Sequence, residues 1–246
     1  MQPKPVEDKL RVMIADDDPT VLLIARLAME RAGFEVTEAT DGAQAIESIR
    51  ASLPDLVLLD VTMPIMDGYT VCKMLRGLPN GERIPVIIIT GLEDIESINR
   101  AYHAGATDFV AKPVNWAILL HRVRYILRAS RALNNARDNE TRLATAQRVA
   151  ELGDWEWDVK RGRFHASAEA VRILGGSVAS ENLESLLNDV HSEDVERVCI
   201  AIDGAVERSE SSTIDHRVVM QSGEVRYVQH QVNCVRADHD GRATRL

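Results

Sequence analysis

The chain has 246 residues, 45% of them hydrophobic and 27% charged, a balance typical of a folded protein with one large or two ordinary domains. The formal net charge of -9 argues against a nucleic-acid binder or a membrane-surface binder, because both need a basic face. Three widely spaced cysteines, an N-terminus without an apolar signal core and the lack of an apolar run of about 18 residues predict a reduced, cytoplasmic protein that spans no membrane.

Residues 10 to 125 alternate short apolar runs with segments of helical periodicity. The apolar runs predict strands at 10–15, 34–38, 55–59, 84–89 and 108–111. The segments between them predict helices at 21–33, 43–50, 69–76 and 95–105, and a fifth helix begins near Trp116. This alternation predicts βαβ units and therefore a flavodoxin-like, doubly wound α/β domain with a five-stranded parallel sheet. Ligands of such sheets bind at the carboxyl ends of the strands.

The helical pattern that begins at Trp116 continues to about Ala150 without a proline or glycine. Apolar residues recur at every seventh position in two sets, which are Leu119, Ile126 and Leu133, then Ala136, Leu143 and Ala150. Because the companion positions include Glu140 and Gln147, the pattern predicts a weak coiled-coil seam of a signalling helix between domains. A solvated amphipathic linker helix is the alternative.

After Gly153 the sequence predicts a second domain of the α+β class. Strands are expected at 155–159, 215–220 and 225–235 in an antiparallel sheet, with helices at 167–175 and 192–208. The expected organisation is therefore an N-terminal tail (1–9), a first domain (10–127), a linker helix (128–150) and a second domain (151–246).

Polar side chains stand at the ends of four predicted strands of the first domain. Asp16 and Asp17 follow the first strand and Asp60 ends the third, and these two strands are neighbours in a sheet of this type. Converging carboxylates raise one another's pKa unless a cation lies between them, and hard oxygens without histidine or cysteine favour Mg²⁺ or Ca²⁺. Thr90 ends the fourth strand and Lys112 follows the fifth. The set suits in-line phosphoryl transfer, with Asp60 attacking phosphorus.

Taken one at a time, these residues also have ordinary explanations. The aspartates could be a solvated acidic run, Thr90 an ordinary hydroxyl at a strand end, and Lys112 part of a turn before a proline. Their occurrence at the ends of four different strands favours a site. The third aspartate, Asp18, precedes Pro19 and is predicted to cap the first helix.

The motifs IADDDP, LLDVTMPIMDG, IIITG and FVAKP resemble those of the receiver domain of two-component response regulators, over residues 10 to about 127. The resemblance implies that Asp60 is the phosphoacceptor. It also implies that Asp16 and Asp17 hold Mg²⁺ together with Asp60 and the backbone carbonyl of Thr62.

The same resemblance implies that Thr90 and Lys112 contact the phosphoryl oxygens and that Phe109 is the aromatic switch residue. A histidine kinase is then the expected phosphodonor. A homodimer is expected through the face formed by the last two helices and last strand of the receiver, through the linker helix or through the second domain. No turnover is expected beyond phosphorylation and dephosphorylation of Asp60.

The segments GDWEWDV (153–159), VHSEDV (190–195), HRVVMQSGEVRYV (216–228) and DHDGR (238–242) resemble a PAS domain of the PAS-fold-3 kind. The closing strand of that family, usually G-T-x-x-D-I-T, is not found up to ATRL (243–246), so the sheet is expected to be one strand short. The resemblance implies a ligand sensor, a dimerisation module or a relay, and it leaves the ligand unknown.

The resulting hypothesis is a phosphorylation-dependent regulator that relays a change through the helix and the PAS domain to an effector. The receiver–PAS order resembles the front half of diguanylate cyclase/phosphodiesterase regulators, with a hybrid histidine kinase as second choice. One alternative is an aspartate-nucleophile phosphatase of the haloacid-dehalogenase type, which needs a second acid where this chain has Thr62. Another is a structural dimer whose receiver is never phosphorylated.

Overall fold

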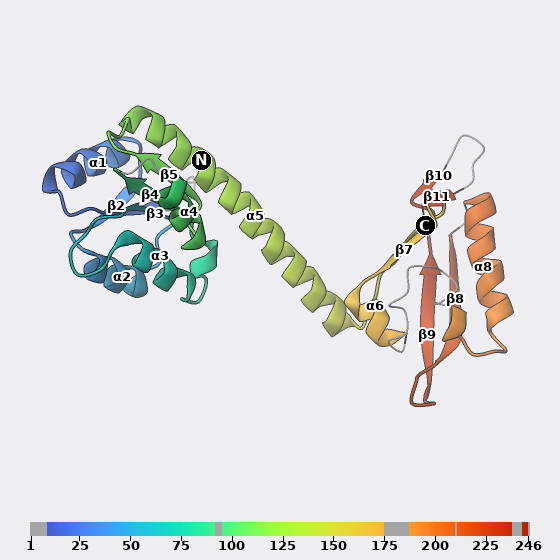
Figure 1. Cartoon of the computed structure of the whole chain (residues 1–246). Coiled ribbons are helices and arrows are strands. Elements are labelled where there is room, and N and C mark those ends of the chain that lie inside the picture. Colours follow the sequence, from blue (N-terminus) through green and yellow to red (C-terminus); the bar gives the residue numbers. More distant parts are fainter. Residues whose placement is uncertain (1–8, 92–94, 175–186, 210, 238–242, 246) are drawn as a thin grey trace, which may run out of the picture. The chain divides into compact units, whose positions relative to one another are not determined.

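The computed structural model describes residues 9–91, 95–174, 187–209, 211–237 and 243–245 (Figure 1). The chain divides into two compact units, Met1–Arg137 (unit 1) and Asp138–Leu246 (unit 2). Among the helices of these described ranges, none combines the length and the apolar character needed to cross a membrane.

Unit 1 contains the predicted five-stranded parallel sheet. Its strands are β1 (Arg11–Ala15), β2 (Glu35–Ala39), β3 (Leu56–Asp60), β4 (Val86–Thr90) and β5 (Asp108–Ala111), in the order β2-β1-β3-β4-β5. Every residue of β3 and β4 is buried, as expected of central strands that are covered on both faces. The prediction of a flavodoxin-like sheet is confirmed.

Helices cover both faces of this sheet. On one face α1 (Pro19–Arg31) and the first part of α5 (Trp116–Ala150) pack on alternate strand residues such as Ile14 and Leu58. On the other face α2 (Gly42–Ala51), α3 (Gly68–Arg76) and α4 (Ile95–His103) pack on the intervening residues, and a short 3₁₀ helix, η1 (Gly81–Arg83), follows α3.

The ends of the helices follow the sequence signals. The side chain of Asp18 accepts a hydrogen bond from the backbone N–H of Thr20 at 2.8 Å, and Pro19 begins α1, so the predicted cap is confirmed. Gly33 and Gly105, which follow α1 and α4, have φ angles of 94° and 89°. Both therefore occupy the left-handed conformation in which glycine ends a helix without strain.

The helix α5 is 35 residues long. The apolar residues of its heptad pattern are buried in the first part of the helix and exposed in the later part. Leu119 and Ile126 are buried in the core of unit 1, so these two positions do not belong to an intermolecular seam, contrary to the prediction. By contrast, the side chains of Leu133 and Leu143 are 54% and 61% exposed. Only the later part of the heptad pattern is exposed and could pack against another chain.

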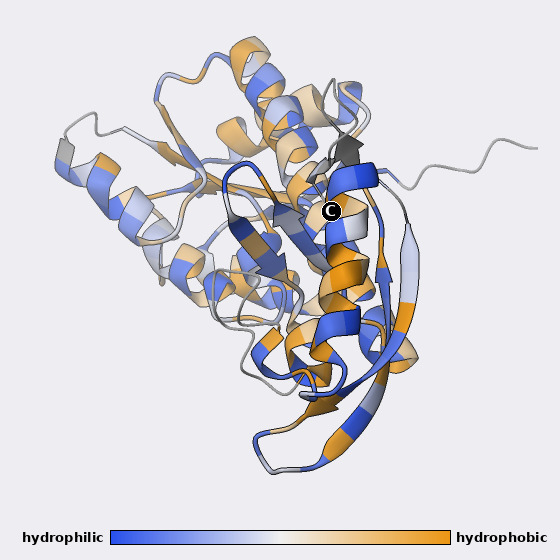
Figure 2. Ribbon diagram, turned by 90° about the vertical axis from the view of Figure 1, so that its right-hand side faces the viewer, coloured by the Kyte–Doolittle hydropathy of each residue, from blue (hydrophilic) through white to orange (hydrophobic). Residues whose placement is uncertain are grey.

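Unit 2 is the predicted α+β unit with antiparallel pairing. Its elements are β6 (Trp155–Asp158), β7 (Arg163–Ala166), α6 (Ala168–Ile173), α8 (Val195–Arg208), β8 (Ser212–Val219), β9 (Val225–Val232), β10 (Arg236–Ala237) and β11 (Ala243–Arg245). One sheet has the order β10-β11-β6-β7, and β8 and β9 form a second, two-stranded sheet. Burial alternates from residue to residue along the long strands β8 and β9, which carry both hydrophobic and hydrophilic residues (Figure 2). The motif at 238–242 lies outside the described residues.

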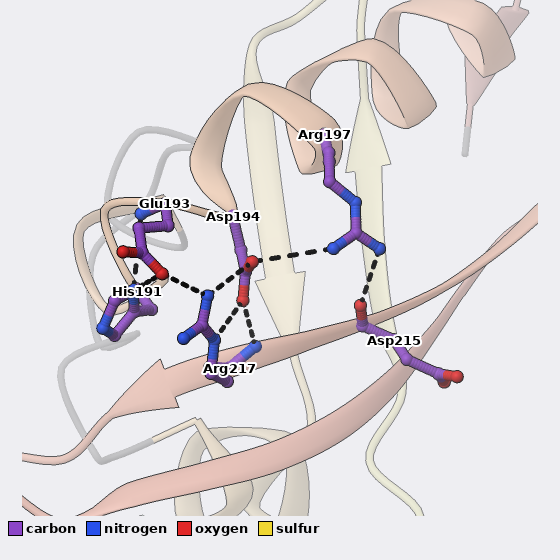
Figure 3. A network of polar contacts seen from close by, with 6 residues as sticks. All are labelled: His191, Glu193, Asp194, Arg197, Asp215 and Arg217. Atoms are coloured by element: carbon purple, nitrogen blue, oxygen red, sulfur yellow. Dashed lines mark hydrogen bonds and ion pairs between the residues drawn. The ribbon is translucent and has the colours of Figure 1, made fainter.

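A polar network joins the start of α8 to β8 (Figure 3). The carboxylate of Asp194 accepts hydrogen bonds from the backbone N–H of Arg217 and from its Nε, both at 2.9 Å. Arg217 also contacts Glu193 at 2.8 Å, and Arg197 lies 3.6 Å from Asp194. Asp194 comes from VHSEDV and Arg217 from HRVVM, so two of the segments that suggested a PAS domain meet here and hold the helix on the strand.

Candidate functional site

The polar residues singled out in the first domain gather at the carboxyl edge of the parallel sheet. Asp16 directly follows β1, Asp60 is the last residue of β3, Thr90 is the last residue of β4, and Lys112 directly follows β5. Because β1, β3, β4 and β5 are consecutive neighbours in the sheet, their ends lie in a row. The edge is the one where ligands of such sheets bind.

Three carboxylates and one ammonium group form the centre of the site. One oxygen of each of Asp16, Asp17 and Asp60 lies within 4.8 Å of the other two. Asp16 and Asp60 are buried, with 1% and 3% of their surface exposed, whereas Asp17 is exposed. The Nζ of Lys112 lies 2.6 Å from Oδ1 of Asp60 and 3.1 Å from Oδ2 of Asp16. Lys112 therefore neutralises part of the charge of both buried carboxylates.

Backbone N–H groups bind the remaining oxygens of the two buried carboxylates. The N–H of Asp18 donates to Oδ1 of Asp16, and the N–H of Thr62 donates to Oδ2 of Asp60, each at 2.9 Å. Both carboxylates are thereby held in one orientation, with their second oxygens toward Lys112.

Burial and charge act in opposite directions on the protonation of this site. Burial raises the pKa of Asp60, Lys112 opposes that rise, and the negative charge of Asp16 adds to it. Burial alone lowers the pKa of Lys112, but its contacts with Asp60 and Asp16 outweigh this effect and raise that pKa. Lys112 therefore stays charged, and a further positive charge near Asp60 would lower the pKa of this carboxyl group.

The donor set fits a hard divalent cation. Asp16, Asp17 and Asp60 form the one cluster of three or more potential ligands among the residues that the structure describes, and it contains no histidine or cysteine. Carboxylate oxygens of this kind suit Mg²⁺ or Ca²⁺ better than zinc or copper. Thr62, predicted to add its carbonyl, follows Asp60 by two residues and uses its N–H to orient that carboxylate.

Glycine is required in the loop that follows Asp60. A Cβ atom at Gly68 would lie 2.1 Å from the backbone oxygen of Asp60, and the N–H of Gly68 donates to the oxygen of Val61 at 3.0 Å. The preceding residue, Asp67, caps α3 by accepting from the N–H of Thr70 at 2.7 Å. Asp67 and Gly68 therefore shape this loop and start the helix that follows it.

The candidate switch residue Phe109 lies on β5, next to β4. Phe109 pairs with Ile88, two residues before Thr90, and its side chain is partly exposed. Its ring meets the ring edge of Tyr102 on α4, with centroids 6.1 Å apart and planes at 85°. Sequence reasoning did not single out Tyr102, because its only signal is an aromatic residue on a short amphipathic helix.

Comparisons with known families match both units. The family described as the response regulator receiver domain matches residues 12–124, and the family described as the PAS fold matches residues 163–246. The order receiver then PAS, expected from the motifs, is confirmed.

Several curated proteins are similar to the chain. The transcriptional regulatory protein CseB of Streptomyces avermitilis is 32% identical over 168 residues, which is 68% of this chain and 70% of that protein. CseB of Streptomyces coelicolor is 36% identical over 152 residues, or 61% of this chain and 64% of that protein. The response regulator PleD of Caulobacter vibrioides is 35% identical over 130 residues, which cover 53% of this chain and only 29% of PleD.

Among solved structures, a response regulator from Chloroflexus aurantiacus is 38% identical, with a TM-score of 0.47, and the match covers 49% of this chain and 98% of that one.

Proposed function

This chain belongs to the response regulator family, and we propose that it accepts a phosphoryl group on Asp60 from a phosphohistidine of a histidine kinase. The observation that carries this proposal is the position of the Asp60 carboxylate. It ends a central strand, is fixed by one backbone N–H, and lies 2.6 Å from the ammonium group of Lys112 beside two further carboxylates.

The proposed reaction is an in-line displacement at phosphorus. An oxygen of Asp60 forms the new P–O bond while the P–N bond to the imidazole breaks, and the electron pair stays on the imidazole nitrogen. The product is an acyl phosphate on Asp60. Lys112 neutralises charge on the transferred oxygens, and Thr90 can donate a hydrogen bond to one of them.

Asp16, Asp17 and Asp60, with the backbone carbonyl of Thr62, are the groups that would hold Mg²⁺ here. When bound, this ion neutralises negative charge on the carboxylates and on the phosphoryl oxygens. The protein holds these carboxylates close together although their negative charges repel one another. The ammonium group of Lys112 reduces this repulsion only in part.

We further propose that Thr90 and Phe109 transmit the change. Phosphorylation adds about 1.5 to 2 negative charges. Movement of the Thr90 side chain toward the new oxygens would leave space for Phe109 to turn inward and separate from Tyr102. The face formed by α4, β5 and α5 would then change, which is the expected surface of a homodimer.

The relay and the output are proposed from the order of the segments. We divide the chain into a receiver (10–127), a linker helix (128–150) and a PAS domain (151–246), and the continuity of α5 across the linker supports a relay along it. Family analogy points to an effector in cyclic-di-GMP signalling, or else to a hybrid histidine kinase. A cytoplasmic location fits either output.

A phosphatase of the haloacid-dehalogenase type is not favoured. That chemistry needs a second acid two residues after the nucleophile, where this chain has Thr62, whose N–H donates to Asp60. The similarity to response regulators points away from it as well.

Incubation with acetyl phosphate and Mg²⁺, followed by intact-mass measurement, tests the proposal. The wild type should gain one phosphoryl group, and Asp60→Asn should gain none. Asp55→Asn, at the opposite end of β3, is the matched control and should be phosphorylated like the wild type. An equal gain on Asp60→Asn, or none on the wild type, would show that the assignment is wrong.

A further inference from the structure

The helix α4 packs on the sheet of unit 1 through small side chains. Within residues 96–104 the buried ones are Ser97, Ala101 and Ala104, with 5%, 2% and 2% of their surface exposed. The neighbouring helix α3 instead buries the larger side chains of Tyr69, Val71, Cys72 and Leu75. The free energy gained by burial grows with the apolar area, so this part of α4 is held less firmly by its packing than α3. Its position therefore depends more strongly on the contacts at its two ends.

The C-terminal end of α4 is fixed by the guanidinium of Arg76, the last residue of α3. Its Nε donates to the backbone oxygen of Gly105 at 2.8 Å, and its Nη1 donates to the oxygens of Gly81 and Ile84 at 2.6 and 2.8 Å. Hydrogen bonds from a charged donor are stronger than neutral ones, and here three carbonyl groups share one donor. The residue that follows α4 by two positions is thereby tied to α3.

The N-terminal half of α4 meets α3 through Tyr69, whose side chain makes two weaker contacts. Its hydroxyl donates to the backbone oxygen of Ser97 at 3.2 Å. The guanidinium of Arg100 lies over its ring, with Cζ 4.6 Å from the ring centroid. A neutral hydrogen bond and a partly exposed cation–π contact each change an equilibrium constant by about two- to fivefold. This hold is therefore the one that can be released.

The N-terminal end of α4 is also the end that is joined to Thr90. β4 ends at Thr90 and α4 begins at Ile95, so residues 91–94 alone separate them in the chain. A displacement of Thr90 toward a phosphoryl group on Asp60 would reach this end of the helix first. The contacts of Tyr69 occur in the arrangement in which Lys112 binds Asp60 directly, at 2.6 Å. They therefore stabilise that arrangement relative to one in which α4 has moved.

We propose that Tyr69 is a positioning residue for the phosphorylation switch. It holds the N-terminal half of α4 in the arrangement in which Lys112 binds Asp60, and α4 turns about its fixed end at Arg76 and Gly105 when this hold is released. The proposal rests on the proposed function, because phosphorylation of Asp60 is what would displace Thr90. By linkage, a variant without the contacts of Tyr69 should bind a phosphoryl mimic on Asp60 more tightly.

The binding of BeF₃⁻ with excess Mg²⁺ tests this expectation in the complete chain, with ¹⁹F NMR to count the bound ion. Tyr69→Phe removes the hydroxyl and Arg100→Gln removes the cation, and each variant should bind about two- to fivefold more tightly than the wild type. Tyr227→Leu, on an 83% exposed side chain of unit 2, is the control and should bind like the wild type. A merely structural role of Tyr69 would lower the stability of unit 1 without tightening this binding.

Two outcomes would count against the proposal, and they are distinguishable. Unchanged or weaker binding in both Tyr69→Phe and Arg100→Gln, beside normal binding in the wild type, would overturn the role of Tyr69 while the assignment of Asp60 stands. No binding by the wild type, or equal binding by Asp60→Asn, would overturn the proposed function and the role of Tyr69 with it.

Hydrogen exchange resolved to single residues locates the fixed end of α4. On addition of BeF₃⁻ and Mg²⁺ to the wild type, exchange should change at least threefold at residues 97–101 and stay within twofold at residues 105–107. An equal change at both ends would overturn the turning of α4 about Arg76.

Discussion

Replacing Lys112 by methionine should destabilise unit 1 much more in the absence of Mg²⁺ than in its presence. Asp16 and Asp60 are buried, and the ammonium group of Lys112 lies within 3.1 Å of an oxygen of each. Methionine keeps most of the length and the apolar stem of the lysine but removes the charge. Two buried carboxylates are then left with only backbone N–H groups as partners.

The size of the effect follows from the exposure of the pair. Removing one partner of a fully buried ion pair costs about 3 to 5 kcal/mol, whereas an exposed pair contributes about 0 to 1 kcal/mol. The Lys112 side chain is 33% exposed and both carboxylates are almost completely buried, so an intermediate loss of about 2 kcal/mol is expected without metal. With a divalent cation on the carboxylates, the loss should fall below about 1 kcal/mol, because the cation supplies the missing charge.

Hydrogen exchange of the amides of β3 and β4 measures this free energy, because such buried strands exchange only through the largest openings of the fold. The measurement is made in EDTA and in excess Mg²⁺. Lys73→Met, on the exposed side of α3, is the control and should change the free energy of unfolding by less than about 0.5 kcal/mol in both solutions. An equal loss for Lys112→Met in EDTA and in Mg²⁺ would refute the electrostatic explanation.

Three further substitutions test other charged or titratable groups. Arg76→Lys should lower the urea midpoint of unit 1 and cost about 2 kcal/mol, because the guanidinium of Arg76 donates to three backbone carbonyls that one amine cannot serve together. Arg217→Ala should lower the thermal stability of unit 2 at neutral pH and have little effect in strong acid. Hydrogen bonds from Arg217 hold the pKa of Asp194 well below its usual value, so this stabilisation is lost as the pH falls and Asp194 is protonated. His230→Phe should reduce the loss of stability of unit 2 on acidification, measured by melting between pH 7 and pH 4. Burial lowers the pKa of His230 to about 4. Between about pH 6.5 and pH 4 this histidine is therefore protonated in the unfolded chain but not in the folded unit, which lowers the free energy of unfolding as the pH falls.

The receiver site could be assembled from the sequence because its geometry depends on topology alone. Asp16, Asp60, Thr90 and Lys112 each stand at the end of an apolar run, and parallel strands place all such ends at one edge. The spacing of the runs predicts the strands, and the strand order of a five-stranded sheet of this type makes β1 and β3 neighbours. No long-range side-chain contact had to be known in advance.

Other features depend on contacts that local pattern does not encode. The period of seven in α5 continues through Leu119 and Ile126, yet these residues pack on the sheet of their own unit. The meeting of Phe109 with Tyr102 depends on how α4 lies on β5. The contact between His216 and His230 depends on the register of β8 and β9, in which Ile214 pairs with His230. A helical or alternating pattern shows which face is apolar but not which surface covers it.

The division of α5 into a buried and an exposed part limits how the proposed signal can travel. Leu119, Val123, Ile126 and Leu127 are buried in unit 1, and burial of each such side chain contributes about 1.5 to 3 kcal/mol. Local unfolding of this segment would therefore cost more than the few kcal/mol by which a switch usually biases its two states. In the proposed relay, a change at Phe109 would therefore reach Leu143 by a small shift of an intact helix. The junction at Gly153, which follows the end of α5 and packs closely on Ala170 of α6, is the place where such a shift would reach α6.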